Sequence, residues 1–367
     1  MLSTDLEVGY IDKIPIRNLW LLMLYASQLF RQVQTRHENK SIEENPDDIP
    51  DLVAEILIES VNRRLRRNLT LGYKNKGAVL GRVRGRINHL QTERQQLLSR
   101  GKIFCSFEEL TINTPRNQFV KAALLELSKV TKPECGHKCR ALAITLGRMG
   151  VSDDATAFTK FATERVSRHD ANDHQMLAAA KLAYDLALPT EFSGQDHPFL
   201  PERESSWVRN LYEKGIAGFY DAVLPRSEWQ VYAGERFDWQ TINESNGLKT
   251  ILPTMKTDII INNLRLKHRI IIDTKFTTIL SDGYYRQETL RSGYIYQIYA
   301  YLRSQEGKDE LASNSSGILL HPTVDKEVDE FAEIQGHRIH FATVNLAASA
   351  REIRNRLLEI VGAGDTD

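Results

Sequence analysis

The sequence predicts an α/β (α+β) protein whose C-terminal half is a mixed sheet flanked by helices. Two isoleucine-rich runs, at 259–261 and 270–272, surround a polar connection at 263–268 and are typical of a hairpin of buried strands. Other elements alternate around this hairpin: strands at 229–237, 317–320 and 340–346, and helices at 207–220, 294–302 and 349–361. Strands mixed with helices in this way are typical of one central sheet covered by helices.

The N-terminal half carries its own elements and is set apart by a stretch rich in proline. Helices are expected at 19–30, 52–65 and 116–130, and strands at 79–87 and 103–110. Prolines and a glycine between residues 187 and 206 interrupt the pattern and favour a linker. Because a chain of 367 residues suggests at least two domains, we expect an N-terminal domain at 1–190, a linker at 191–206 and a C-terminal domain at 207–367.

The composition is that of a soluble globular protein, with 26% charged and 41% hydrophobic residues. The formal net charge is zero, so nucleic-acid binding would have to come from local basic patches. Three cysteines are too few for a disulfide framework and fit a reducing compartment. The first ten residues lack a signal-peptide pattern, and the apolar run at 19–26 is too short to span a bilayer. We therefore expect a cytoplasmic protein without membrane contact.

The predicted hairpin brings two acidic side chains together. Antiparallel pairing across the connection places Asp258 opposite Asp273, and Lys275 follows on the same face. Two close carboxylates suit a hard divalent cation such as Mg²⁺. A neighbouring lysine can orient a water molecule or offset charge on a phosphorane-like transition state. The alternative interpretation is a solvated strand end that carries an ordinary Asp–Lys ion pair.

Three arginines stand at alternate positions of the strand expected at 79–87. Alternation along a strand would place Arg82, Arg84 and Arg86 on one face. Such a row of cations can meet nucleic acid or an acidic partner surface, and it can equally be a solvated strand face.

Two clusters have the residue types of metal ligands but not their spacing. Cys135, His137 and Cys139 lack paired CxxC spacing and an obvious fourth ligand, so we do not expect a zinc site there. The polar segment at 169–174 is interpreted as a turn that precedes a helix at 175–186.

Acidic and polar residues before and after the hairpin extend this pattern. Glu213 lies on the helix expected before it, and Gln297 and Tyr301 lie at i and i+4 on one face of a helix after it. In chain order the constellation is Glu213, Asp258, Asp273-Thr274-Lys275 and Gln297-x3-Tyr301. This order resembles the PD-(D/E)xK nuclease superfamily, which implies a restriction-endonuclease-like sheet flanked by helices.

Nearly the whole chain resembles the McrC family, the nuclease subunit of the McrBC modification-dependent (5-methylcytosine) restriction system. The N-terminal motifs are Pro15-Ile16-Arg17-Asn18, Leu24-Tyr25-Ala26, Gly85-Arg86-Ile87, and Ser106-Phe107 through Asn113-Thr114 to Asn117. The C-terminal motifs are Leu252-Pro253, Thr257-Asp258-Ile259, Asp273-x-Lys275-Phe276, Tyr296-Gln297-x3-Tyr301 and His321-Pro322-x2-Asp325.

The resemblance implies a Mg²⁺-dependent endodeoxyribonuclease and assigns roles to the constellation. Asp258 and Asp273 would bind the metal, with Glu213 as an accessory acid, and Lys275 would be the catalytic lysine. The remaining pair, Gln297 and Tyr301, would position the DNA strand or the lysine.

The resemblance also implies a partner for the N-terminal domain. That domain would dock on an McrB-like hexameric AAA+ GTPase that recognises modified double-stranded DNA, and would stimulate its GTPase. GTP would be bound by the partner, because this chain has no Gly-x4-Gly-Lys-Ser/Thr loop. Arg84 and Arg86 are candidates for the stimulating group. Two alternatives stay open: a non-catalytic assembly factor that activates a GTPase, and a stand-alone repair nuclease.

Overall fold

The computed structural model describes most of the chain, which divides into two compact units. The described residues are 10–11, 13–27, 29–30, 46–154, 156, 161, 171–192, 201–282, 288–323 and 326–363. One unit combines Met1–Ile49 with Asp185–Asp367, and the other is Pro50–Tyr184. We call them the sheet unit and the arm unit. Among the described helices, none has the length and apolar character needed to cross a membrane.

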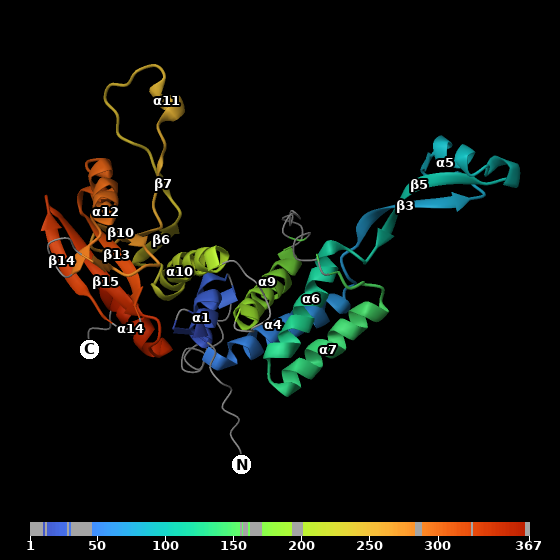
Figure 1. Ribbon diagram of the computed structural model, residues 1–367, viewed down its shortest axis with the longest axis horizontal. Helices are drawn as coiled ribbons and strands as arrows, with labels where there is room; N and C mark the ends of the chain where they lie inside the picture. Colours follow the sequence, from blue (N-terminus) through green and yellow to red (C-terminus); the bar gives the residue numbers. More distant parts are fainter. Residues whose placement is uncertain are drawn as a thin grey trace, which may run out of the picture. The chain divides into compact units, whose positions relative to one another are not determined.

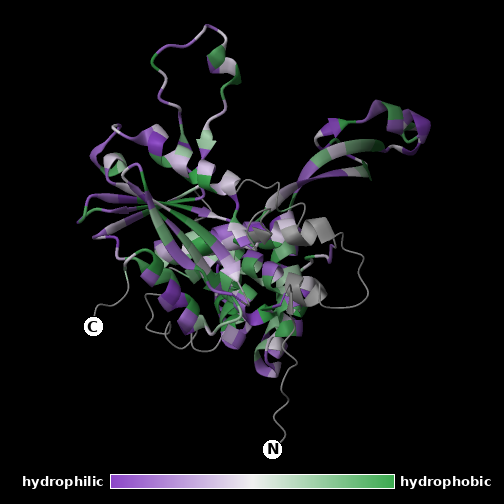
Figure 2. Ribbon diagram, turned by 60° about the vertical axis from the view of Figure 1, so that its left-hand side comes forward, coloured by the Kyte–Doolittle hydropathy of each residue, from purple (hydrophilic) through white to green (hydrophobic). Residues whose placement is uncertain are grey.

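The sheet unit is built on a six-stranded mixed sheet with the strand order β14-β15-β13-β10-β9-β6 (Figure 1). The strands are β6 (Trp229–Ala233), β9 (Ile259–Asn263), β10 (His268–Thr274), β13 (Ser315–Thr323), β14 (Asp329–Ile334) and β15 (His337–Asn345). Strands β10, β13 and β15 run parallel, whereas the other neighbours pair antiparallel. Figure 2 shows hydrophobic residues gathered along the central strands. This architecture confirms the predicted mixed α/β class.

Helices flank this sheet: α10 (Pro201–Val223), α12 (Ser292–Gln305) and α14 (Ala350–Ile360). Ile298 and Leu302 of α12 pack with Ile271 and Leu319 of the sheet in one hydrophobic core. Helix α10 contacts β6, and α14 contacts β15. The smaller elements of this unit are β1 (Tyr10–Ile11), β2 (Ile14–Pro15), η1 (Pro46–Asp48), β7 (Arg236–Phe237), α11 (Leu248–Ile251), β8 (Met255–Lys256), β11 (Leu280–Asp282), β12 (Glu288–Leu290) and α13 (Glu310–Ser313).

An N-terminal helix, α1 (Ile16–Ala26), belongs to the sheet unit, so the units differ from the predicted domains 1–190 and 207–367. The Asn18 side-chain amide donates hydrogen bonds to the carbonyls of Leu346 and Ala348, at 2.7 and 2.9 Å. Helix α1 packs against α10. The sequence pattern predicts that this helix is buried, because it is apolar nearly all round. Periodicity does not predict which element it packs against.

The linker expected at 191–206 is partly helical. Helix α9 (Ala171–Phe192) extends into its first residues, and α10 begins at Pro201. Residues 193–200 lie outside the described part of the chain.

The arm unit consists of helices and a three-stranded antiparallel sheet with the order β3-β5-β4. Its elements are α4 (Ile49–Leu65), β3 (Gly72–Leu80), β4 (Arg86–Ile87), α5 (His89–Arg94), η2 (Leu98–Arg100), β5 (Ile103–Thr111), α6 (Pro115–Val130), α7 (Pro133–Arg148) and α9, which crosses the unit boundary. Within this unit, β3 and β5 form a long ribbon that extends away from α6 and α7 (Figure 1).

The predicted row of arginines on one strand face is wrong. Strand β3 ends at Leu80, and only Arg86 of the three arginines lies in a strand. The cause is the sheet order, because β3 and β4 pair with opposite edges of β5 and the segment between Leu80 and Arg86 crosses from one edge to the other. Gly85 in this segment has φ +69°, and a Cβ there would lie 2.5 Å from the Ser106 carbonyl oxygen. The Arg84 guanidinium instead lies 4.0 Å from the centre of the Phe107 ring.

Cys135, His137 and Cys139 do not lie together on one face of α7. Cys135 and Cys139 are buried on one face of α7, while His137 is exposed on another. Burial raises the pKa of the Cys139 thiol, to about 11. Both cysteines therefore behave as small hydrophobic side chains.

The acidic residue of the predicted polar turn lies inside α9 and is a buried structural anion. Asp173 is 1% exposed. Its carboxylate lies 3.1 Å from the side-chain nitrogens of Arg64 and Arg116, and accepts a hydrogen bond of 2.8 Å from Thr70. Asp173 thus joins α9 to α4 and α6 within the arm unit.

Replacing Asp173 with asparagine is expected to destabilise the arm unit by about 3–5 kcal/mol, because removing one partner leaves buried guanidinium charge uncompensated. Urea unfolding followed by circular dichroism measures the change. Glu134→Gln is the matched control, since its ion pair with Lys138 is on the surface and 82% of the glutamate side chain is exposed. Equal stability of Asp173→Asn and this control would contradict the assigned role.

Candidate functional site

The hairpin formed by β9 and β10 has the predicted register. Asn262 pairs with Arg269 and Ile260 with Ile271, around a turn at 264–267. All six isoleucines are buried, with at most 4% exposure. Because both faces of β9 are buried, the length of the turn rather than an alternation of buried and exposed side chains sets this register.

Asp258 lies just before β9, and it reaches β10 through its side chain rather than by strand pairing. Its Oδ2 accepts hydrogen bonds from the backbone N–H and the hydroxyl of Thr274, at 2.8 and 2.9 Å. Ladder pairing ends at Ile259 and Ile272. Meanwhile the Asp258 carbonyl accepts from the Gly234 N–H, at 2.9 Å. Two donors on one carboxylate oxygen leave the other oxygen for a further ligand.

Asp273 is the most buried acid of the constellation, with 0% exposure on β10. Both of its carboxylate oxygens lie 2.9 Å from Lys275 Nζ. Burial raises the pKa of Asp273 to about 6 against the opposing effect of Lys275, and the charges of Asp258 and Glu213 raise it further. The ion pair therefore exists, but it is a buried pair beside other acids and not a solvated strand end.

Glu213 projects from α10 towards the same acids. Burial raises its pKa, the charge of Asp258 raises it further, and Lys256, Lys214 and Lys275 lower it. Three carboxylates that act on one another electrostatically inside a partly buried site are typical of functional sites.

Gln297 and Tyr301 are in contact one turn apart on α12, as predicted. The Gln297 amide donates to the Tyr301 hydroxyl at 2.7 Å, and that hydroxyl donates to the Lys256 carbonyl at 2.7 Å. Burial is the main cause that raises the pKa of Tyr301, and the charges of Asp273 and Asp258 add to it. The pair thus ties α12 to the backbone just before Asp258.

The carboxylates fit a divalent cation as a pair. Among the described residues, no three His, Cys, Asp or Glu side chains are gathered closely enough to hold a metal ion. Among these residues, the buried Oδ2 of Asp273 contacts the Lys275 ammonium, 2.9 Å away, and accepts no further hydrogen bond. This oxygen and the Oδ1 of Asp258 are carboxylate oxygens, the kind of ligand that Mg²⁺ prefers. Glu213 would be an additional, outer acid.

Sequence reasoning gave no role to three residues around this site. Thr274 holds Asp258, Tyr294 has its ring centre 5.4 Å from Lys275 Nζ, and His321 packs 5.7 Å from that ring. Their positions depend on the pairing of β10 with β13 and on the docking of α12, neither of which has a local sequence signal. Asp325 of the His321 motif lies outside the described residues.

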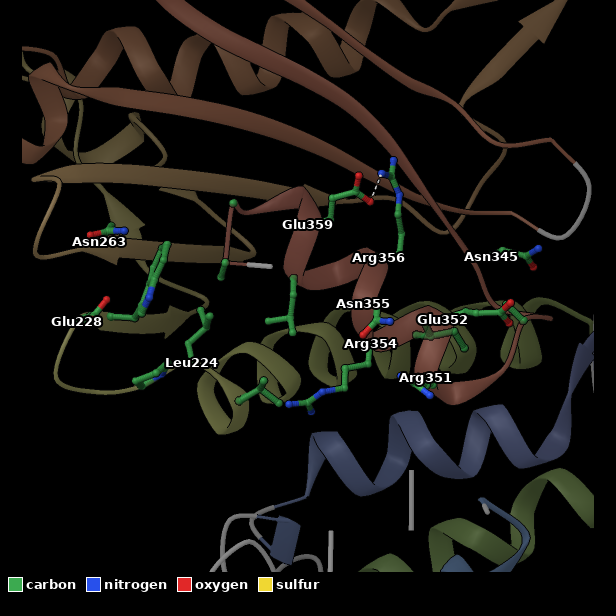
Figure 3. A pocket seen from close by; sticks show the side chains of 18 of the residues that line it. Leu224, Glu228, Asn263, Asn345, Arg351, Glu352, Arg354, Asn355, Arg356 and Glu359 are labelled. Carbon is green, nitrogen blue, oxygen red and sulfur yellow. Dashed lines mark hydrogen bonds and ion pairs between the residues drawn. The ribbon is translucent and has the colours of Figure 1, made fainter. Parts of the chain in front are cut away.

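A cavity of about 1270 Å³ lies elsewhere on the sheet unit, between the end of α10, β9 and α14 (Figure 3). None of the predicted site residues lines it. Two of its acids already have partners, because Glu359 is paired with Arg356, and Glu352 accepts hydrogen bonds from Ser349 at the start of α14. We therefore place the candidate site at the carboxylates and not at this cavity.

Comparison with known proteins gives one family. The family model described as "McrBC 5-methylcytosine restriction system component" matches residues 5–322. No curated protein is a significant match.

Two solved structures from Thermococcus gammatolerans are similar to this chain. One is described as a refined half-complex from the tetradecameric assembly of McrB AAA+ hexamers with bound McrC. It shows 13% identity and a TM-score of 0.41, over 94% of this chain and 76% of that one. The other is a cryo-EM structure of the McrBC complex, with 12% identity and a TM-score of 0.33, over 48% of this chain and 56% of that one.

Proposed function

This chain belongs to the McrBC 5-methylcytosine restriction system component family, and from that premise we propose that it is an McrC-like subunit that hydrolyses DNA phosphodiester bonds. The observation that carries the proposal is the convergence of Asp258, Asp273 and Lys275 at one end of the β9–β10 hairpin. Family membership alone would fit a scaffold, whereas a retained pair of acids beside a lysine supports catalysis.

We assign Mg²⁺ to Asp258 and Asp273, with Glu213 as the accessory acid. When bound there, the ion would lower the pKa of water and neutralise phosphate charge. The reaction joins a water oxygen to phosphorus while the bond from phosphorus to the leaving ester oxygen breaks. Lys275 donates hydrogen bonds to a non-bridging phosphate oxygen, where negative charge grows. Gln297 and Tyr301 fix the backbone at Lys256, and so the position of Asp258.

The proposed partner is an McrB-like hexameric AAA+ GTPase. Support comes from the family and from the absence of a P-loop motif in the sequence, so that GTP would be bound by another chain. In this proposal the partner recognises modified double-stranded DNA, and this chain stimulates its GTPase and cuts the DNA.

A cleavage assay tests the whole proposal. Methylated and unmethylated plasmids are incubated with this chain, with and without the McrB-like partner and GTP, in Mg²⁺ or in excess EDTA, and GTP hydrolysis is followed in parallel. We expect cutting of methylated DNA only when partner, GTP and Mg²⁺ are all present. GTPase stimulation without any cutting would show a non-catalytic activator instead. Cutting by this chain alone, without a GTP effect, would show a stand-alone nuclease.

A further inference from the structure

His321 of β13 is a buried histidine with one unused nitrogen. The residue is only 1% exposed. Nδ1 lies 2.7 Å from the Thr277 carbonyl oxygen, and a carbonyl only accepts, so Nδ1 carries the proton. Nε2 therefore carries a lone pair, and it has no hydrogen-bond partner among the residues that the structure describes. An unsatisfied buried acceptor destabilises the folded state, so this nitrogen calls for an explanation.

The register of β10 and β13 places His321 beside Lys275, the candidate catalytic lysine. In the parallel pair of β10 and β13, Thr274 is the partner of Leu320, and the Lys275 N–H donates to the Leu320 carbonyl at 3.0 Å. One step further along both strands, His321 is the lateral neighbour of Lys275. Neighbours in such a row point to the same face of a sheet, about 5 Å apart.

The same face carries an aromatic ring that both residues approach. The Tyr294 ring centre lies 5.4 Å from Lys275 Nζ and 5.7 Å from the centre of the His321 ring. Burial lowers the pKa of His321 to about 4, and the nearby charges of Lys275 and Arg291 lower it further, so the imidazole is neutral at physiological pH. A neutral imidazole beside an ammonium is an acceptor without charge repulsion.

We propose that His321 is a positioning residue for Lys275. When a divalent cation binds Asp273, the Lys275 ammonium donates a hydrogen bond to Nε2 of His321. In the present structure Lys275 is held by Asp273. An ammonium has three donors, so a second acceptor keeps it in place once the carboxylate has a competing ligand. This inference rests on the proposed function, in which Asp273 binds a divalent ion and Lys275 meets the phosphate.

The chain contains a matched control for this histidine. His337, at the start of β15, is 2% exposed, has Nδ1 2.9 Å from the Ser315 carbonyl, and also has an Nε2 without a hydrogen bond among the described residues. It lies at the opposite end of the parallel strands from Lys275, because Ser315 begins β13. Replacing either histidine with asparagine keeps an N–H for the carbonyl and removes Nε2.

The first measurement needs no metal, DNA or partner. In an Asp273→Asn background, which removes the carboxylate charge, the rate of Lys275 acylation by an amine-reactive ester is followed by peptide mass spectrometry. We expect several-fold faster labelling when His321→Asn is added, because the ammonium loses its remaining acceptor. His337→Asn should leave the rate unchanged. Equal rates in all three folded proteins would overturn the proposal.

The second measurement is single-turnover cleavage in the complete complex with Mg²⁺. We expect His321→Asn to lower the cleavage rate on the order of 10²-fold with unchanged DNA affinity, as a misplaced catalytic group does. His321→Gln, which extends an amide oxygen towards the position of Nε2, should recover part of the loss. A rate equal to that of His337→Asn would also overturn the proposal. If the labelling effect appears but the wild type never cuts, the contact stands and the proposed function fails.

Discussion

Replacing Asp273 with asparagine is expected to abolish DNA cleavage, with a loss of at least about 10³-fold, because the change removes a proposed metal ligand and a charge that holds Lys275. Asparagine has almost the same shape as aspartate, so the fold should survive. Burial raises the pKa of Asp273 to about 6, so the ionised carboxylate destabilises the folded state at neutral pH. The thermal midpoint of the variant should therefore equal or exceed that of the wild type. Loss of function with no loss of stability is the signature of a functional site.

Asp309, the N-cap residue of α13, pairs with the other end of β10 and provides the control. Asp309 lies 3.2 Å from Arg269 at the start of β10, and its side chain is 44% exposed. The Asp309→Asn variant should therefore cut methylated DNA at the wild-type rate. Asp258→Ala and Lys275→Ala should be as inactive as Asp273→Asn while still binding the partner. Wild-type cleavage by these three variants, with partner and GTP present, would refute the site.

The part of the site that could be predicted is the part set by short-range geometry. The register of β9 and β10 follows from the short turn between two isoleucine runs, so Asp258 and Asp273 could be placed at the same end of the hairpin. The contact between Gln297 and Tyr301 follows from helical spacing.

The parts that escaped prediction depend on contacts between distant segments. Asp258 is turned towards Thr274 because β6 pairs with β9 and engages the Asp258 carbonyl through Gly234. His321 lies beside Lys275 only because β13 pairs with β10. A parallel pairing needs a long crossover, and no local pattern states which strands it joins. The predicted arginine row failed for the same reason, because β3 and β4 pair with opposite edges of β5 and the segment that carries Arg82 and Arg84 crosses between them.

The assignment of α1 to the sheet unit makes a second strong prediction. Gly218 of α10 faces the backbone of α1, and a Cβ built on it would lie 2.0 Å from the Tyr25 carbonyl oxygen. Gly215, one turn earlier, would place its Cβ 3.0 Å from the Leu22 carbonyl oxygen. The two helices thus approach each other through glycines, and a backbone atom cannot move aside as the end of a side chain can.

Gly218→Ala is therefore expected to destabilise the sheet unit by about 3 kcal/mol, at the upper end of overpacking effects, because α1 must shift as a whole. Gly293→Ala on α12 is the control, since a Cβ there meets no atom within 4 Å and alanine favours the helix. Denaturant unfolding measures both. If α1 instead belonged with residues 50–184, as the predicted domain 1–190 requires, both variants would be as stable as the wild type or more stable. Asn18 of α1 also donates hydrogen bonds to the carbonyls that follow β15. A displaced α1 would therefore loosen the sheet that carries Asp273, and the rate of DNA cleavage should fall together with stability.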